Sequence, residues 1–115
     1  MRPIIVATIL LCLLGAVALA ATPSERHIVI KASRFFYTPA RIVLKTGEPV
    51  VLDLTALDRL HGFDIPDLKV RADVLPGQVT SVRIVPPKAG SYEFHCDNFC
   101  GTGHETMAAV IVVED

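Results

Sequence analysis

Residues 91–96 read Ser-Tyr-Glu-Phe-His-Cys, and this stretch decides the fold class. The aromatic rings of Tyr92 and Phe94 and the thiol of Cys96 occupy every second position, whereas the intervening side chains are polar. Successive side chains of a β-strand point to opposite faces, so the alternation predicts a half-buried strand. Cys96 is then expected to enter the protein interior, and His95 to face away from it.

The same two-residue period recurs along most of the chain from residue 27 onward. Turn sequences that combine Gly or Pro with polar residues separate the alternating stretches, and outside the first 21 residues no stretch has helical periodicity. Short strands at regular spacing predict an all-β fold, a Greek-key β-sandwich or barrel. The expected strands are 27–32, 41–45, 50–55, 68–73, 79–85, 91–96 and 108–113, with a short apolar strand after His61.

The N-terminal segment differs from the rest of the chain. An apolar run covers residues 4–21 and ends in Ala18-Leu19-Ala20-Ala21, which is typical of a secretory signal peptide before its cleavage site. We therefore expect a signal peptide at residues 1–21 and one domain at residues 22–115. The alternative is an uncleaved membrane anchor, because the run is long enough to span a bilayer. Both interpretations predict an exported protein, either periplasmic or membrane-anchored facing the periplasm.

Size and charge narrow the functional class. The 115 residues suffice for one ordinary domain. Without the leader and its Arg2, ten basic and twelve acidic side chains remain, so the mature net charge is near −2. This balance argues against a nucleic-acid partner, and no basic amphipathic stretch predicts binding to a membrane surface. A protein or a metal is the expected partner.

Three cysteines are encoded, and Cys12 lies inside the expected leader. The mature domain therefore keeps Cys96 and Cys100. In an oxidising compartment, two thiols this close in sequence could form a disulfide, which is one alternative for their role.

The segment from Cys96 to Met107 predicts a copper site. It offers the thiolates of Cys96 and Cys100, the imidazole of His104 and the thioether of Met107. Soft sulfur together with imidazole selects copper, whereas a thioether is a poor ligand for zinc. Two intervening glycines allow the loop to fold closely enough for these groups to meet. A ligand set of this kind leaves no acid, base or nucleophile arrangement, so we do not expect an enzyme.

A second imidazole has to come from elsewhere in the chain, and His61 is the candidate. It lies in the sequence Asp-Arg-Leu-His-Gly-Phe of residues 58–63, directly before a short apolar strand. Asp58 is a candidate for orienting the loop or a ligand from outside the metal's own shell.

These two motifs carry a family resemblance. The pattern C-x3-C-x3-H-x2-M with an upstream D-x-x-H-G-F resembles the binuclear CuA domain of cytochrome c oxidase subunit II and of nitrous oxide reductase. Residues 34–47 resemble the first hairpin of cupredoxins in general. The likeness covers nearly the whole mature domain and implies a cupredoxin-like electron-transfer protein.

The resemblance also implies a role for each ligand. The sulfurs of Cys96 and Cys100 would bridge two copper ions, with His61 and His104 each binding one of them. Met107 would be a weak axial ligand on the copper held by the first histidine.

The other copper would receive the backbone carbonyl of Asn98. In the oxidase pattern a glutamate occupies this position and serves a neighbouring metal at a subunit interface, a role that asparagine fills poorly. The chain also has no tryptophan and lacks the pair of transmembrane helices of the oxidase subunit. These departures favour a separate carrier over an oxidase subunit.

Several uses of the copper remain open from the sequence. An electron carrier would exchange electrons with a redox protein such as a c-type cytochrome, and a copper carrier or sensor would pass the metal to a copper acceptor. A mononuclear blue-copper site would hold one ion with His61, Cys100, His104 and Met107 and leave Cys96 unused. Phe99, between the thiols, is expected either to shield the site or join a docking patch, or to pack on the core.

Overall fold

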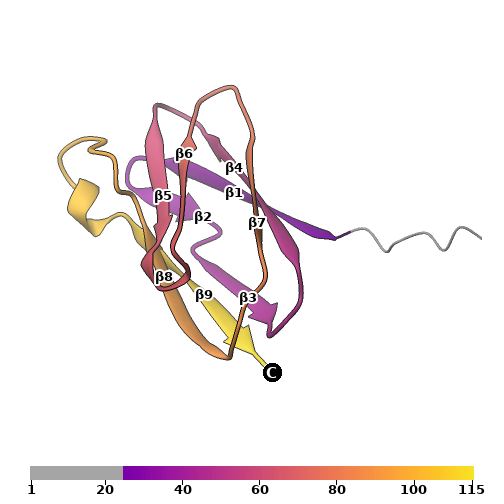
Figure 1. Cartoon of the computed structure of the whole chain (residues 1–115). Coiled ribbons are helices and arrows are strands. Elements are labelled where there is room, and N and C mark those ends of the chain that lie inside the picture. The colour runs from indigo at the N-terminus through magenta and orange to yellow at the C-terminus, as the bar shows by residue number, and fades with distance from the viewer. Residues whose placement is uncertain (1–24) are drawn as a thin grey trace, which may run out of the picture.

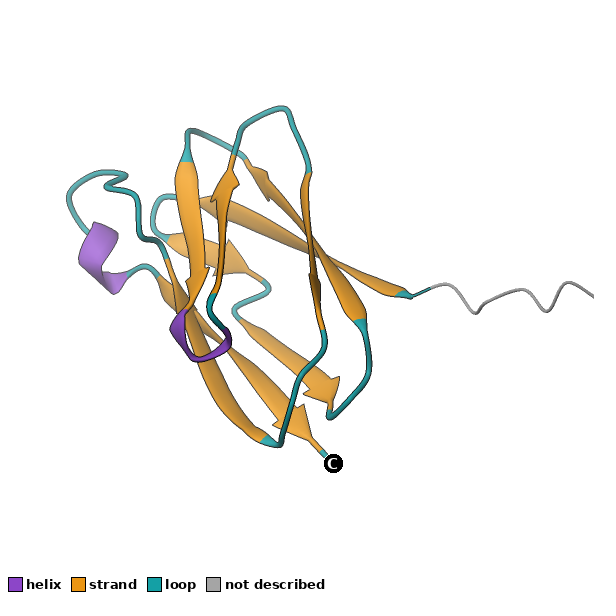
Figure 2. Ribbon diagram, in the orientation of Figure 1, coloured by secondary structure: helices purple, strands orange, loops and turns teal. Residues whose placement is uncertain are grey.

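The computed structural model describes residues 25–115, and the expected signal peptide at residues 1–21 lies outside them (Figure 1). The described chain forms two β-sheets that pack face to face (Figure 2). The all-β sandwich expected from the sequence is therefore confirmed. Its only helical elements, within residues 25–115, are two 3-10 turns, η1 (Pro66–Leu68) and η2 (His104–Thr106).

The two sheets have four and five strands. The first contains, in spatial order, β2 (Phe36–Thr38), β1 (Arg26–Ser33), β4 (Val50–Ala56) and β7 (Thr80–Ile84). The second contains β3 (Arg41–Lys45), β9 (Ala108–Glu114), β8 (Gly90–His95), β5 (His61–Ile65) and β6 (Val70–Val74). The β1–β4 and β3–β9 pairs are parallel and the other pairs are antiparallel. The chain passes repeatedly between the sheets, as in Greek-key folds.

The alternation in the sequence sets which face of each strand is buried. Along β4, every second residue from Val50 to Ala56 is buried, and the residues between them are half-buried. Three aromatic rings fill the centre of the sandwich, because Phe94 lies 4.9 Å from both Tyr37 and Phe63 between ring centroids. The core therefore lies between the sheets and extends to the end of β8, where Cys96 follows.

Two segments differ from the sequence-based expectation. The strand expected at 68–73 begins only at Val70, because η1 and a left-handed Lys69 (φ 53°) turn the chain first. The stretch 34–47 is also not one hairpin. β2 completes a hairpin with β1, whereas β3 pairs with β9 in the other sheet. The short β2 has too few residues for a periodic pattern.

Three connections meet at one end of the sandwich. The β8–β9 loop projects there and carries η2 (Figure 1). The β4–β5 loop lies beside the β1–β2 hairpin, because the Leu57 N–H donates to the Ala32 carbonyl at 2.8 Å. The predicted ligand residues lie in the β8–β9 loop and at the end of the β4–β5 loop, where His61 begins β5. Within residues 25–115 there is no helix with the length and apolar character needed to cross a membrane.

Candidate metal centre

The β8–β9 loop is closed at its base by the strands that it joins. The Cys96 N–H donates to the Met107 carbonyl at 3.1 Å, which extends the β8–β9 pairing by one step beyond His95 and Ala108. Within the loop, the His104 N–H donates to the Gly101 carbonyl at 3.1 Å and begins the turn η2. The loop therefore leaves and re-enters the sheet at two predicted ligands, Cys96 and Met107.

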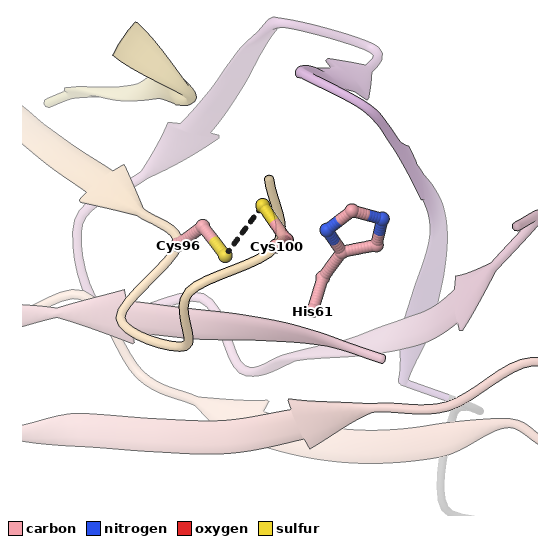
Figure 3. Close-up of side chains that lie close together, drawn as sticks. All are labelled: His61, Cys96 and Cys100. Carbon is pink, nitrogen blue, oxygen red and sulfur yellow. Dashed lines mark hydrogen bonds between the residues drawn. The ribbon is translucent and has the colours of Figure 1, made fainter. Parts of the chain in front are cut away.

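The two thiols face one another inside the loop. Cys96 and Cys100 are buried free cysteines whose sulfurs lie 3.6 Å apart (Figure 3). A disulfide bond brings its sulfurs to about 2.05 Å, so the structure has no such bond between them. The separation leaves both sulfurs able to ligate a metal.

His61 reaches the same place from the start of β5 and is fully buried. Its Nε2 lies 2.7 Å from Asp58 Oδ1, and its Nδ1 has no hydrogen-bond partner. One ring nitrogen of His61 faces the two sulfurs and the other points away (Figure 3). Ligand atoms of His61, Cys96 and Cys100 all lie within 4.8 Å of one another. A buried nitrogen without a hydrogen-bond partner, aimed at two sulfurs, is a group that a bound metal ion would satisfy.

Asp58 fixes the orientation of this imidazole. Burial opposes its charge, but hydrogen bonds from His61 and from the backbone N–H groups of Arg34 and Arg59 lower the pKa of Asp58 to about 2. The Asp58 carboxylate is therefore ionised at neutral pH and accepts a hydrogen bond from the protonated Nε2 of His61. The Nδ1 lone pair is then left for a metal, as is usual for a histidine ligand held by a carboxylate.

The other three predicted ligands also contact the sulfur pair. His104 Nδ1 lies 3.4 Å from Cys100 Sγ, and Met107 Sδ lies 3.8 Å from the same sulfur. The carbonyl oxygen of Asn98 lies 3.0 Å from Cys96 Sγ. The structure thus brings all six predicted ligand residues to one place. His104 contacts Cys100 but is not part of the cluster of His61, Cys96 and Cys100, whose ligand atoms all lie within 4.8 Å of one another.

Burial keeps the thiol of Cys100 protonated in the absence of metal. It raises the pKa of Cys100 to about 11, and the adjacent Cys96 adds to the rise. The guanidinium of Arg59 acts in the opposite direction. The Nε of Arg59 is a further buried polar atom without a partner in residues 25–115. A bound cation would replace the thiol protons, because the thiolate is the form that ligates metal.

Gly62 supports the centre in a way that the sequence did not indicate. Its N–H donates to Cys96 Sγ at 3.3 Å, and its carbonyl accepts from the Tyr37 hydroxyl at 2.6 Å. A Cβ at this position would lie 1.9 Å from Asp97 Oδ1, to which the Arg71 guanidinium donates a hydrogen bond at 3.0 Å. The only signal for this role was the glycine directly after His61.

Two further residues lie around the centre. His95 is half-exposed and its Nε2 lies 3.4 Å from Asp64 Oδ2, so the expectation that it faces away from the interior is confirmed. Phe99 is 73% exposed, and its ring lies 5.8 Å from that of His104 between centroids. The alternative that Phe99 packs on the core is therefore wrong.

The donor set fits copper. Two thiols, two imidazoles and a thioether match the soft ligands that copper prefers, and zinc sites rarely use a thioether. In the described part of the chain, no second group of three or more His, Cys, Asp or Glu side chains lies close enough to bind a metal.

The fold and these ligands define the class of protein, and comparison with known proteins agrees. The chain belongs to the cupredoxin-like domain family, whose model matches residues 4–113.

Individual relatives narrow the comparison beyond the family. Two cytochrome c oxidase subunit 2 proteins of Thermus thermophilus are each 33% identical over 93 residues, or 81% of this chain. The chain covers 69% of one relative and 55% of the other. Among solved structures, the periplasmic domain of subunit II of cytochrome oxidase of Bradyrhizobium japonicum has the same fold. Its TM-score is 0.74 at 18% identity, over 82% of this chain and 87% of that one.

The family, the sulfur–imidazole donor set and these relatives together identify a copper-binding electron-transfer domain of the cupredoxin type.

Proposed function

We propose that the chain transfers single electrons through two copper ions held between the thiolates of Cys96 and Cys100. The observation that carries this proposal is the pair of sulfurs 3.6 Å apart, with a ring nitrogen of His61 within 4.8 Å of both and His104 Nδ1 3.4 Å from Cys100 Sγ. His61 would bind one ion through its unpartnered Nδ1, and His104 would bind the other. A mononuclear site on His61, Cys100, His104 and Met107 would leave the buried thiol of Cys96 without a role.

Two weaker ligands complete the set. The thioether of Met107 and the carbonyl of Asn98 each approach one of the sulfurs, and both would serve as weaker ligands to a bound copper. The amide of Asn98 donates to Asp73 at 3.2 Å, so the side chain is already engaged. Only its backbone is then needed at the metal, and the interface role of the oxidase glutamate is not part of this proposal.

The protein's contribution is to hold these ligands still. When bound, the copper pair supplies a one-electron couple shared across two thiolates. The buried residues keep water from the sulfurs, and the β8–β9 neck fixes both ends of the loop. Ligands that move little between oxidation states allow fast electron exchange, and nearby hydrogen bonds adjust the reduction potential.

The relatives suggest where this electron transfer takes place. They are subunit 2 proteins of cytochrome c oxidase. We therefore propose that the chain is either the electron-transfer module of an oxidase complex or a separate electron carrier of the same type. A c-type cytochrome is the proposed redox partner. We further propose residues 1–21 as the export signal, residues 22–115 as the copper domain, and the periplasm as its location.

Electron exchange and copper transfer can be separated by experiment. The copper-loaded protein is mixed with a reduced c-type cytochrome in a stopped-flow instrument, and separately with a Cu(I) chelator. Rapid, reversible oxidation of the cytochrome with slow loss of copper is expected. Slow electron exchange with ready loss of copper would instead indicate a copper carrier. The Cys96→Ser, Cys100→Ser double variant is the control, because it should neither load copper nor oxidise the cytochrome.

A further inference from the structure

The β1–β2 turn contacts both segments that carry the predicted ligands, although it supplies no ligand itself. We propose that Phe35 is a positioning residue, which holds the β8–β9 loop in the geometry that the two copper ions require. This inference rests on the proposed binuclear function and extends it to a residue outside the ligand set.

The ring of Phe35 lies against the backbone of the ligand loop. A Cβ built on Gly101 would lie 3.3 Å from the ring, and one built on Gly103 would lie 3.0 Å from it. Both glycines have positive φ, 135° and 110°, which residues with side chains rarely adopt. Gly101 and Gly103 are therefore favoured for two reasons: their backbone has positive φ, and a side chain at either position would press on the Phe35 ring. The flat ring fills the space that side chains would occupy.

The neighbouring residue of the same turn reaches the other ligand segment. The Arg34 N–H donates to Asp58 Oδ2 at 2.9 Å, and Asp58 Oδ1 lies 2.7 Å from His61 Nε2. One turn therefore touches the loop of Cys100 and His104 through an aromatic ring, and orients His61 through a carboxylate.

The loop depends on this outside contact. Its internal restraints include the bonds from the His104 N–H to Gly101 O and from the Thr106 N–H to Gly103 O, both at 3.1 Å. Two glycines within four residues give the unrestrained backbone a large conformational entropy. Without the ring beneath them, we expect the loop to open more often, and His104 to lose its fixed position relative to Cys100.

The test compares two neighbouring phenylalanines. Phe35 is partly buried against the core, whereas Phe36 is 66% exposed, so Phe36→Ala is a matched control for Phe35→Ala. In the metal-free protein, amide hydrogen exchange at His104 and Thr106 should become about tenfold faster in Phe35→Ala and stay unchanged in Phe36→Ala. Equal exchange in both variants would overturn the proposal.

The second readout is the paramagnetic resonance spectrum after copper loading. The wild type and Phe35→Tyr, which keeps the ring, should couple the unpaired electron equally to two copper nuclei. Phe35→Ala should couple it unequally, and an unchanged spectrum would contradict the positioning role. If Phe35→Ala does not fold, Phe35→Leu takes its place, because it keeps apolar volume without the flat ring. A wild type that binds one copper would refute the proposed function, and the exchange measurement would still decide the role of Phe35.

Discussion

At the scale of single residues, the pair of His61 and Asp58 determines which nitrogen is presented to the metal. The carboxylate lies at Nε2, and the opposite nitrogen is buried with no partner. A neutral imidazole has one donor and one acceptor nitrogen, so the position of the carboxylate selects the tautomer. The sequence identified Asp58 as a candidate for orienting the loop or a ligand, and the structure shows that its carboxylate contacts Nε2 of His61.

Replacing this carboxylate should weaken copper binding without unfolding the domain. Asp58→Asn keeps the shape but removes the charge that orients His61. Loss of such a partner typically costs about 10–100-fold in metal affinity, and we expect an effect of this size in a competition titration with a copper chelator.

A second His–Asp pair provides the control for that variant. His27 Nδ1 lies 2.9 Å from Asp53 Oδ2 in the strands β1 and β4, and neither residue belongs to the centre. Asp53→Asn should leave copper affinity unchanged. Equal affinity in Asp58→Asn and Asp53→Asn would show that Asp58 has no part in presenting His61.

The binuclear and mononuclear models predict different effects of replacing Cys96. With both sulfurs as bridges, Cys96→Ser should remove the sulfur-to-copper absorption bands of the wild type and lower the copper content. A mononuclear site on Cys100 would keep its spectrum, because Cys96 would not be a ligand. Visible absorption and metal analysis of the purified variant distinguish the two models.

The metal-free protein should lose stability in alkaline solution. The folded state raises the pKa of Cys100 from 9.0 to about 11, so it favours the protonated thiol more than the unfolded chain does. This contribution is complete below pH 9.0 and is lost as the pH rises through about 11.

Urea unfolding under reducing conditions measures the effect. Across this pH range, the free energy of unfolding should fall more steeply in the metal-free wild type than in Cys100→Ser. Parallel pH profiles for the two proteins would mean that the thiol does not contribute in this way.

At the scale of elements, the β8–β9 loop joins a hydrogen-bonded neck to two glycines, Gly101 and Gly103, that lie against the ring of Phe35. Gly103→Ala should destabilise the metal-free protein, because it adds a Cβ at positive φ and 3.0 Å from the Phe35 ring. A side chain in such a strained backbone conformation costs about 1–3 kcal/mol before any steric clash.

Gly77→Ala separates the two contributions. Gly77 also has positive φ, 71°, but a Cβ there would meet nothing within 4 Å. Urea unfolding should therefore show a larger loss for Gly103→Ala than for Gly77→Ala. Equal losses would mean that the contact with Phe35 contributes nothing to stability.

The elements that the sequence predicted well are those with a clear two-residue period. β4 and β8 bury alternate residues as expected, and Cys96 follows β8 on the buried face. The sequence missed β2, which has three residues, and η1, which delays the start of β6. Both depend on local turns and pairing partners that leave no periodic signal.

The candidate site was predictable as far as its chemistry is local. Thiols, an imidazole and a thioether within twelve residues indicate a copper ligand loop on their own. The contacts of Gly62 and Phe35 were not predictable, because they join segments that are distant in the chain. Neither residue has a side chain that ligates metal, so ligand chemistry could not identify them.

At the scale of the whole molecule, the sandwich brings the β1–β2, β4–β5 and β8–β9 connections to one end. The core between the sheets fixes the strands, and the strands fix the loop ends that carry the ligands. Phe99 is exposed at this end, beside the half-buried His104. A redox partner that approached this end would meet an aromatic ring close to a predicted copper ligand.

The central claim is that this end of the fold holds two copper ions between two sulfurs. It is tested most directly by loading the purified domain with copper, counting the metal and recording its paramagnetic resonance spectrum. We expect two copper ions per chain and one unpaired electron that is shared equally between both nuclei. A single copper ion per chain, with the electron localised on one nucleus, would contradict the account.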